Sequence, residues 1–202
     1  MSFIVFEGLD GSGKTTQVSR LQDYFAQQGI ICLCTREPSD STIGGMARDA
    51  VRGRIPLSPD TLALLFAADR AEHMAKEVQP VLEKQGVVIC DRFVYSNLAY
   101  QGTTIKMQDI VAYNKAALNS RPPDITFFID TTPEECTRRI MATRAGMDIF
   151  DGIEFAKKIR AQYMQAFSHF EQHMPVTTID GNKPPDEVFA HIMAEIRRKI
   201  NM

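Results

Sequence analysis

A glycine-rich stretch near the N-terminus, GLDGSGKTT, follows directly on the apolar run SFIVFE. Gly8, Gly13, Lys14 and Thr15 satisfy the pattern G-x-x-x-x-G-K-[ST]. Glycines allow successive backbone N–H groups to curl around an anion, and the start of a helix adds positive potential at that point. With a strand before it and a helix after it, the stretch predicts a loop that binds phosphate groups, and few folds contain such a loop.

We expect this loop to bind a nucleoside triphosphate. Lys14 is placed to reach the β- and γ-phosphates, and the Thr15 hydroxyl can ligate Mg²⁺. The residues expected around the triphosphate are Gly8, Leu9, Asp10, Gly11, Ser12, Gly13, Lys14, Thr15 and Thr16. The competing interpretation is a glycine turn with an incidental lysine, and the flanking strand and helix argue against it.

Five short apolar segments alternate with longer stretches of helical spacing. They are SFIVFE (2–7), IICLCT (30–35), VVICD (87–91), ITFFID (125–130) and VTTID (176–180). Each is too uniformly apolar to have one side in water, which predicts a parallel α/β sheet with helices on both faces. We find no linker, so we expect a single domain over residues 1–202.

Two helices carry clear start signals, and one segment carries none. SPD from Ser58 and TPE from Thr132 each combine an N-cap residue, a proline and an acidic first turn. The segment MATRAGMDIFDG (141–152) fits no regular element, and we interpret it as a loop-like insertion between two helices.

The composition limits the partners of this chain. Its 202 residues include 23 Lys and Arg against 25 Asp and Glu, a formal charge of -2. Such a balance creates no field for nucleic acid or an anionic membrane, so we expect neither as a partner. We see no secretory signal and no long apolar span, and we interpret the cysteines as buried strand thiols. These features predict a cytoplasmic protein.

A second magnesium ligand is expected at the end of a strand beside the loop. Asp91 closes the apolar run VVICD, at the carboxyl end where ligands collect in open α/β sheets. The alternative is that Asp91 caps the helix that follows. Arg92 comes next, and its fork geometry suits phosphate oxygens.

Three classes of phosphate-loop protein compete at this point. A GTPase-type regulatory module is disfavoured, because NKAA (114–117) lacks the aspartate of the guanine motif N-K-x-D. A nucleic-acid motor normally has a longer chain and a basic track. A small-molecule kinase needs several cations around two phosphate chains, and the arginines at separate element ends supply them.

Two pairs of residues could form a base pocket in such a kinase. Phe66 and Arg70 stand at i and i+4 on one predicted helix, and Asn97 and Tyr100 at i and i+3 on another. They would offer a stacking ring, two groups for base edges and a bulky wall. The alternative makes Phe66 core, Arg70 a surface side chain and Tyr100 interior.

At these residues the chain resembles the thymidylate kinase family over nearly its whole length. The motifs GLDGSGKTTQ, TREP, LLFAADRAEH, DRFVYSNLAYQG and RPPDITFFID occur in the family order. The resemblance implies a P-loop NTPase fold with a five-stranded parallel sheet and a lid, a homodimer, and transfer of the ATP γ-phosphate to dTMP. The alternative is a kinase of the same fold that acts on another nucleotide or nucleoside.

The resemblance also implies roles for single residues. Phe66 would stack on thymine, Arg70 and Asn97 would contact the base, and Tyr100 would crowd the 2′ position. Arg92 would clamp the acceptor phosphate, and Asp10 would lie near Mg²⁺ and the acceptor. The further residues expected around dTMP are Arg36, Glu37, Pro38 and Gln101.

The lid departs from the family pattern. Gly11 stands where some members carry an arginine inside the P-loop, so the lid should supply the catalytic arginine. Ile149 and Asp151 replace a usual arginine and glutamate. Arg144 is therefore the first candidate for the transition-state cation, and Arg139 is the second. The other expected catalytic residues are Lys14, Arg92 and Asp10.

Overall fold

The computed structural model describes residues 1–142, 149–170, 172 and 174–199. Its centre is one sheet of five parallel strands in the order β2-β3-β1-β4-β5. The strands are β1 (Ser2–Glu7), β2 (Cys32–Arg36), β3 (Val87–Asp91), β4 (Ile125–Asp130) and β5 (Val176–Asp180). The predicted α/β fold with a five-stranded parallel sheet is confirmed.

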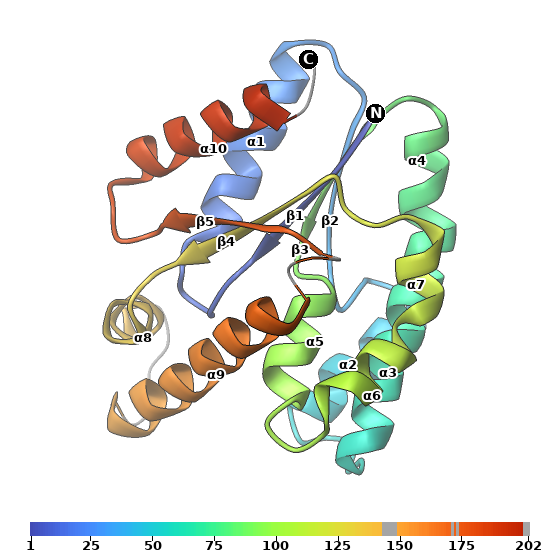
Figure 1. The fold of residues 1–202 in the computed structure, drawn as a ribbon, viewed down its shortest axis with the longest axis vertical. Coiled ribbons are helices and arrows are strands. Elements are labelled where there is room, and N and C mark those ends of the chain that lie inside the picture. The colour runs from blue at the N-terminus through green and yellow to red at the C-terminus, as the bar shows by residue number, and fades with distance from the viewer. Residues whose placement is uncertain (143–148, 171, 173, 200–202) are drawn as a thin grey trace.

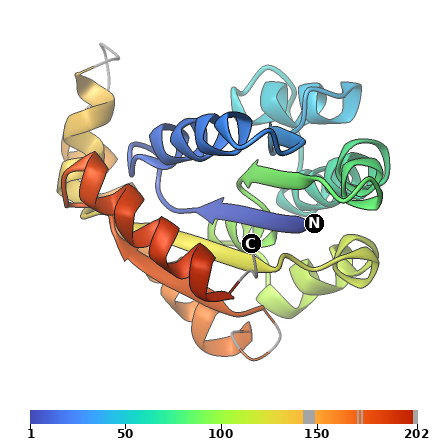
Figure 2. The same ribbon diagram turned by 90° about the horizontal axis from the view of Figure 1, so that it is seen from above.

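Helices connect consecutive strands and cover both faces of the sheet (Figures 1 and 2). They are α1 (Lys14–Gln27), α2 (Thr42–Val51), α3 (Pro59–His73), the π-helical turn η1 (Met74–Val78), α4 (Gln79–Glu83), α5 (Val94–Gln101), α6 (Met107–Tyr113), α7 (Lys115–Ser120), α8 (Pro133–Met141), α9 (Ile149–Phe170) and α10 (Pro185–Lys199). Figure 1 shows α1 and α10 on one face of the sheet, with α5 and α9 on the other.

The strands alternate their side chains between two hydrophobic cores, as the period of an extended chain requires. Ile4 and Phe6 of β1 face α1 and α10, where they join a buried cluster that includes Leu21 of α1. Phe3 and Val5 of the same strand face the opposite side and pack in the cluster of α5 and α9. Both faces of the inner strands β1, β3 and β4 are buried, which explains their apolar sequences. The edge strands β2 and β5 are only partly buried.

The predicted helix starts are confirmed. The Ser58 hydroxyl accepts a hydrogen bond from the Thr61 N–H, and the Thr132 hydroxyl accepts one from the Glu135 N–H. Each helix then has its proline in the first turn. The insertion predicted over 141–152 is shorter in the described part, because α9 already begins at Ile149. Adding turns to a long helix costs little once its nucleus exists.

Two other predictions need correction. β2 begins at Cys32 and not at Ile30, because the Ile30 N–H is used by the carbonyl of Phe25 at the end of α1. Cys136 lies on α8 and not in a strand, although it is buried. All four cysteines are free thiols, and Cys32 and Cys34 are only partly buried.

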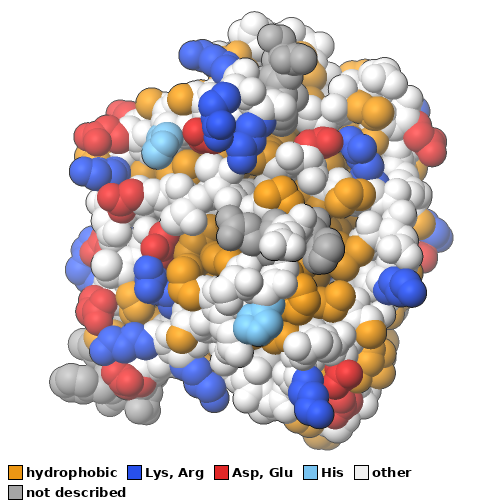
Figure 3. Space-filling view, viewed as in Figure 1, with side chains coloured by type: hydrophobic (Ala, Val, Ile, Leu, Met, Phe, Trp, Pro, Cys, Tyr) orange, Lys and Arg blue, Asp and Glu red, His pale blue; other side chains and the backbone are white. Residues whose placement is uncertain are grey.

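Loops at the carboxyl ends of the strands come together along one edge of the sheet, the usual place for ligands in an open α/β fold. The glycine-rich loop follows β1 there, and Arg92 follows β3. Acidic and basic side chains are interspersed over the face in Figure 3. Among the described helices, none is long and apolar enough to cross a membrane.

Candidate active site

The glycine-rich loop between β1 and α1 has the backbone of a phosphate-binding loop. Gly8, Gly11 and Gly13 all have φ in the region that glycine favours, at 147°, 78° and 99°. Side chains would also collide here, since a Cβ on Gly11 would lie 2.5 Å from the carbonyl oxygen of Cys136 in α8. The chain then enters α1 at Lys14, as the sequence predicted.

Lys14 is held inside this loop before any ligand is bound. Its Nζ donates to the carbonyl oxygens of Gly8 at 3.0 Å and Leu9 at 2.8 Å, and the residue is 5% exposed. Burial, followed by the nearby positive charge of Arg92, lowers the pKa of Lys14 to about 8. A phosphate group would replace the two carbonyls as the partner and restore the charged form.

Thr15 and Asp91 lie together, which fits a magnesium site. The Thr15 hydroxyl donates to Asp91 Oδ2 at 3.2 Å, while the buried Asp91 Oδ1 has no hydrogen-bond partner. Hydroxyl and carboxylate oxygens are the ligands that Mg²⁺ takes beside nucleotide phosphates. The alternative of a capping aspartate is excluded, because the N-cap of α5 is Phe93.

A first cavity, here called the α8 pocket, opens on the α8 side of the glycine-rich loop. Its lining residues are Ser12, Gly13, Thr16, Gln17, Ile129, Glu135, Arg138, Arg139, Gly181, Lys183, Pro185 and Val188. Arg139 reaches the loop from α8 and donates to the carbonyl of Ser12 at 3.3 Å and of Gly181 at 3.3 Å. Glu135 holds Arg139 and Arg138, and hydrogen bonds from both lower its pKa to about 2.

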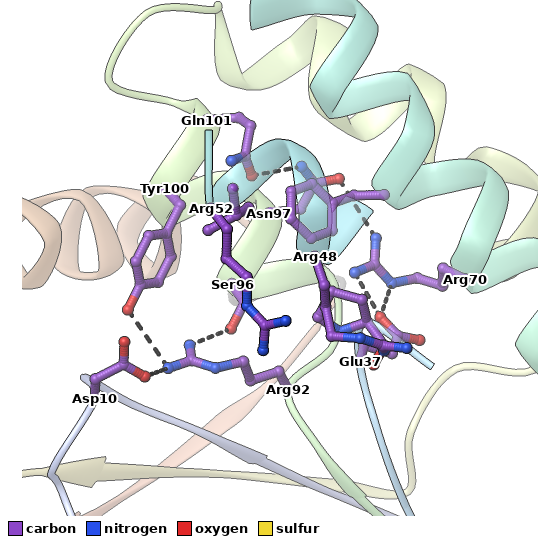
Figure 4. Close-up of a pocket in the computed structure, with 13 residues that line it drawn as sticks. Asp10, Glu37, Arg48, Arg52, Arg70, Arg92, Ser96, Asn97, Tyr100 and Gln101 are labelled. Atoms are coloured by element: carbon purple, nitrogen blue, oxygen red, sulfur yellow. Dashed lines mark hydrogen bonds and ion pairs between the residues drawn. The ribbon is translucent and has the colours of Figure 1, made fainter. Parts of the chain in front are cut away.

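A second cavity, here called the central pocket, measures about 270 Å³ and meets the glycine-rich loop at Asp10 (Figure 4). Its lining residues are Asp10, Glu37, Pro38, Arg48, Val51, Arg52, Phe66, Arg70, Arg92, Ser96, Asn97, Tyr100 and Gln101. Figure 4 shows Arg70 and Glu37 at one end of the pocket, Arg92 and Asp10 at the other, and Arg48 and Arg52 between them. Pockets of this kind bind small molecules with a few fixed polar contacts.

Arg70 forms the buried end of the central pocket. It is 2% exposed, and its Nε donates to Glu37 Oε2 at 2.6 Å. The guanidinium also donates to Asn97 Oδ1 at 3.4 Å, to the Asn114 side chain and to the carbonyl of Phe93 at 3.1 Å. These partners fix the orientation of Arg70, and the interpretation of it as a surface side chain was wrong.

Glu37 is braced from its other side by His73. The two approach at 3.2 Å, and the second ring nitrogen of His73 lies 2.8 Å from the Thr35 hydroxyl. Glu37 and His73 are buried, and buried polar groups need such partners in place of water. The network therefore holds the Glu37 carboxylate, and through it Arg70, in one place.

Arg92 forms the other end of the central pocket and reaches the glycine-rich loop. Its Nη2 donates to Asp10 Oδ1 at 2.5 Å, and its Nη1 donates to the Ser96 hydroxyl at 2.9 Å. The guanidinium lies 5.2 Å from the centre of the Tyr100 ring. Arg92 has φ 76°, a strained value for a non-glycine residue that is typical of functional sites.

Glu7 supports Arg92 from behind. This buried carboxylate accepts hydrogen bonds from the Phe93 N–H at 2.8 Å and from the Ser96 N–H at 3.1 Å, so it caps α5 from the end of β1. It also accepts from the hydroxyls of Ser96 at 2.5 Å and Tyr163 at 3.0 Å. Both hydroxyls contact Arg92 in turn, which ties its position to the sheet.

The structure brings most of the predicted site residues together. Phe66, Asn97, Tyr100 and Gln101 line the central pocket with Glu37 and Pro38, and Phe66 is only half buried, so it is not core. Arg36 does not line this pocket; it is exposed and pairs with Asp40 at 2.9 Å. Arg144 lies outside the described residues, as does half of the predicted insertion, and its role stays a prediction.

The sequence reasoning missed several residues that line the central pocket or support it from behind. Arg48 and Arg52 come from α2 in the segment ARDAVR, and their i, i+4 spacing could have placed both on one helix face. Ser96 stands four residues after Arg92 and could have been found in the same way. Asn114 and Glu7 carry no local signal, since their partners come from distant parts of the chain.

Comparison with known proteins adds independent evidence. A family model described as thymidylate kinase matches residues 6–192. A probable thymidylate kinase of Pyrococcus abyssi is 37% identical to the chain, over 98% of this chain and 97% of that protein. The thymidylate kinases of Clostridium novyi and Bacillus velezensis are 34% and 31% identical, over 95% and 99% of this chain and 96% and 98% of theirs.

Proposed function

The chain belongs to the thymidylate kinase family, and from that premise we propose how its residues perform thymidylate kinase activity, the transfer of the ATP γ-phosphoryl group to dTMP. It is an ATP-dependent nucleotide kinase, a phosphotransferase. The observation that carries the assignment of residues is the 2.5 Å contact between Arg92 and Asp10, which joins the central pocket to the P-loop.

ATP occupies the P-loop from Gly8 to Thr16, and its base lies toward the α8 pocket. The loop amides and Lys14 hold the β- and γ-phosphates. Lys14 already points into the loop and exchanges two carbonyl partners for phosphate oxygens. A buried cation at this point offsets the charge that develops on the transferred group, where water would otherwise weaken the interaction.

The acceptor dTMP occupies the central pocket with its base between Phe66 and the buried end. The Arg70 contact with Asn97 is its longest, at 3.4 Å, so a pyrimidine oxygen can take that N–H at little cost. Tyr100 closes the sugar side, where burial raises the pKa of its phenol and keeps it neutral. Arg92 binds the 5′-phosphate and turns it toward the P-loop.

Thr15 and Asp91 are the residues that would hold Mg²⁺. When bound, the ion neutralises charge on the β- and γ-phosphates. The supporting observation is the orphaned Asp91 Oδ1 beside the Thr15 hydroxyl. Asp10 has a separate role here, because its carboxylate is paired with Arg92 and orients that guanidinium.

A further cation comes from the lid, which makes this chain a lid-arginine type. The supporting observation is at Gly11, where a side chain would meet the backbone of α8 at 2.5 Å and no P-loop arginine would fit. Arg144 is the proposed cation. We also propose one kinase domain over residues 1–202, which acts as a homodimer in the cytoplasm without nucleic acid or membrane as partner.

The assignment is tested by ADP release with MgATP and a panel of acceptors: dTMP, dUMP, thymidine, dCMP, AMP and none. We expect fast turnover on dTMP and less on dUMP, which lacks one methyl group worth about 1–3 kcal/mol. Equal turnover with and without an acceptor would refute the kinase assignment. Preference for another monophosphate would refute the roles of Phe66, Arg70 and Asn97.

The lid assignment has its own test. We expect Arg144→Ala to lower kcat by roughly 10³-fold or more with little change in the KM for dTMP, as for arginines that stabilise phosphoryl transfer. Arg139→Ala is the matched variant, since Arg139 contacts the P-loop backbone. A loss below tenfold in Arg144→Ala with a large loss in Arg139→Ala would move the role to Arg139.

A further inference from the structure

The central pocket contains more positive charge than its own carboxylates can balance. Four guanidinium groups line it, from Arg48, Arg52, Arg70 and Arg92. Only two carboxylates do so, from Asp10 and Glu37, which leaves a formal excess of two positive charges. A pocket with such an excess favours an anionic ligand.

Three of the four arginines already have partners. Arg70 pairs with Glu37 at 2.6 Å, and Arg92 pairs with Asp10 at 2.5 Å. Arg48 donates to the carbonyl oxygen of Pro38 at 2.9 Å, which fastens the loop after β2 to α2. Their geometry is therefore set by the protein itself.

Arg52 differs from these three. It is the C-cap residue of α2, where its backbone N–H donates to the carbonyl of Arg48 at 3.0 Å, and it is exposed. Its side chain makes no hydrogen bond or ion pair with any residue in the described part of the chain. Figure 4 shows its side chain running from α2 into the pocket, toward the side where Arg92 and Ser96 lie. The nearby Arg54 is different, because its guanidinium pairs with Asp49 at 3.0 Å and it does not line the pocket.

We infer that Arg52 is a second guanidinium for the 5′-phosphate of the acceptor nucleotide, and this inference rests on the proposed function. A phosphomonoester carries close to two negative charges near pH 7, since its second pKa is about 6. That charge matches the excess in the pocket. The guanidinium fork can bind two phosphate oxygens at once, and Arg92 would take the others.

If Arg52 has this role, its replacement should weaken the binding only of ligands that carry a phosphate. Arg52→Leu keeps an apolar side chain without branching at Cβ and removes the charge. Arg52→Lys keeps a positive charge but lacks the planar guanidinium. Arg54→Leu, just beyond the end of α2, is the matched control. The readouts are kcat and KM for dTMP, and the inhibition constant of thymidine, which has the same base and sugar without the phosphate.

We expect Arg52→Leu to raise the KM for dTMP by roughly tenfold to 100-fold, in line with the loss of a charged hydrogen bond, with kcat near the original value. Arg52→Lys should show a smaller rise, and Arg54→Leu none. The inhibition constant of thymidine should change less than about twofold in all three variants, because it lacks the group that Arg52 binds.

Two outcomes would overturn the inference while the kinase assignment stands. One is an unchanged KM for dTMP in Arg52→Leu. The other is an equal loss for dTMP and thymidine, which would assign Arg52 to the base or the sugar. If the unaltered enzyme fails to phosphorylate dTMP, the proposed function falls and the inference falls with it. Equal melting temperatures of the variants exclude misfolding as the cause.

Discussion

The central pocket and the α8 pocket flank the same P-loop, yet they hold their cations in opposite ways. In the central pocket the side chains of Arg70 and Glu37 are 2% and 3% exposed. In the α8 pocket the side chains of Arg138 and Glu135 are 71% and 26% exposed. A buried ion pair is fixed by its surroundings, whereas an exposed pair is screened by water and easily replaced.

We infer from this difference that acceptor recognition and phosphoryl transfer depend on different parts of the site. The buried end of the proposed acceptor pocket contains Arg70 and Glu37, so we expect a change at this end to alter the stability and the affinity together. The donor side depends on backbone amides, one lysine and arginines near the surface, so a change there alters the rate and leaves the fold intact. The predictions below test this separation.

The largest expected effect is on stability, from removal of a buried charge in the central pocket. Arg70→Ala leaves the Glu37 carboxylate buried without its cation and should lower the free energy of unfolding by about 3–5 kcal/mol. Arg138→Ala removes the exposed counterpart and should leave the urea midpoint unchanged within error. Equal shifts of the two midpoints would show that the pockets do not differ in this respect.

The next effect is on the rate, from the donor side. Lys14→Met removes the buried cation of the P-loop and should lower kcat by about 10²–10³-fold, as loss of a transition-state contact does. The affinity for dTMP, measured by calorimetry, should stay within about twofold, because Lys14 does not line the central pocket. Lys157→Met on α9 is the exposed control. A fall in dTMP affinity equal to the fall in kcat would contradict the separation.

A pH dependence should appear on the donor side only. Burial lowers the pKa of Lys14 to about 8 from a model-compound value of 10.5. Above pH 8 the free enzyme loses the charge that binds phosphate, so the KM for ATP should rise by up to about tenfold per pH unit. The KM for dTMP should stay flat over the same range, since the acceptor cations are arginines and do not deprotonate.

The lowered pKa of Lys14 weakens ATP binding at high pH but should increase the stability of the folded chain there. Between pH 8 and 10.5 the unfolded chain keeps the Lys14 proton that the folded chain has released. The contribution of Lys14 to the free energy of unfolding should therefore increase with pH in this window. Lys14→Arg keeps its charge and should remove the rise in the KM for ATP; a rise that persists would assign it to another group.

The smallest expected effect concerns the choice of sugar. Tyr100→Ala opens the wall of the central pocket and should improve use of the ribonucleotide relative to dTMP by roughly tenfold. Tyr100→Phe keeps the ring beside Arg92 and should preserve the discrimination. The ratio of kcat/KM values for the two substrates measures this. If this ratio is unchanged in Tyr100→Ala, Tyr100 contributes to packing and not to the choice of sugar.

Local features of the sequence predict the fold well. Neighbouring residues, such as Ser58 with Pro59, are enough to predict the starts of α3 and α8. The same is true of the P-loop and of four of the five strands. The start of β2 was predicted two residues early, because a backbone hydrogen bond to Phe25 at the end of α1 uses the Ile30 N–H. Apolar character alone gives no sign of that bond.

The site is predicted less completely, for a physical reason. Phe66 and Arg70 were found through helical spacing, but the burial of Arg70 depends on Asn114 and Glu37, which lie 44 and 33 residues away in the chain. Arg36 looked equivalent to Glu37 in TREP, yet the alternation of an extended chain turns it outward to Asp40. Contacts between distant segments decide such cases.

Glu7 gives the two substrates a common reference point. It ends β1 one peptide bond before the P-loop begins at Gly8, and its carboxylate holds the first amides of α5. A displacement of β1 therefore carries the donor loop and the acceptor helix in the same direction. In the proposed mechanism one strand end therefore positions both substrates, and we expect a displacement of β1 to change the distance between them little.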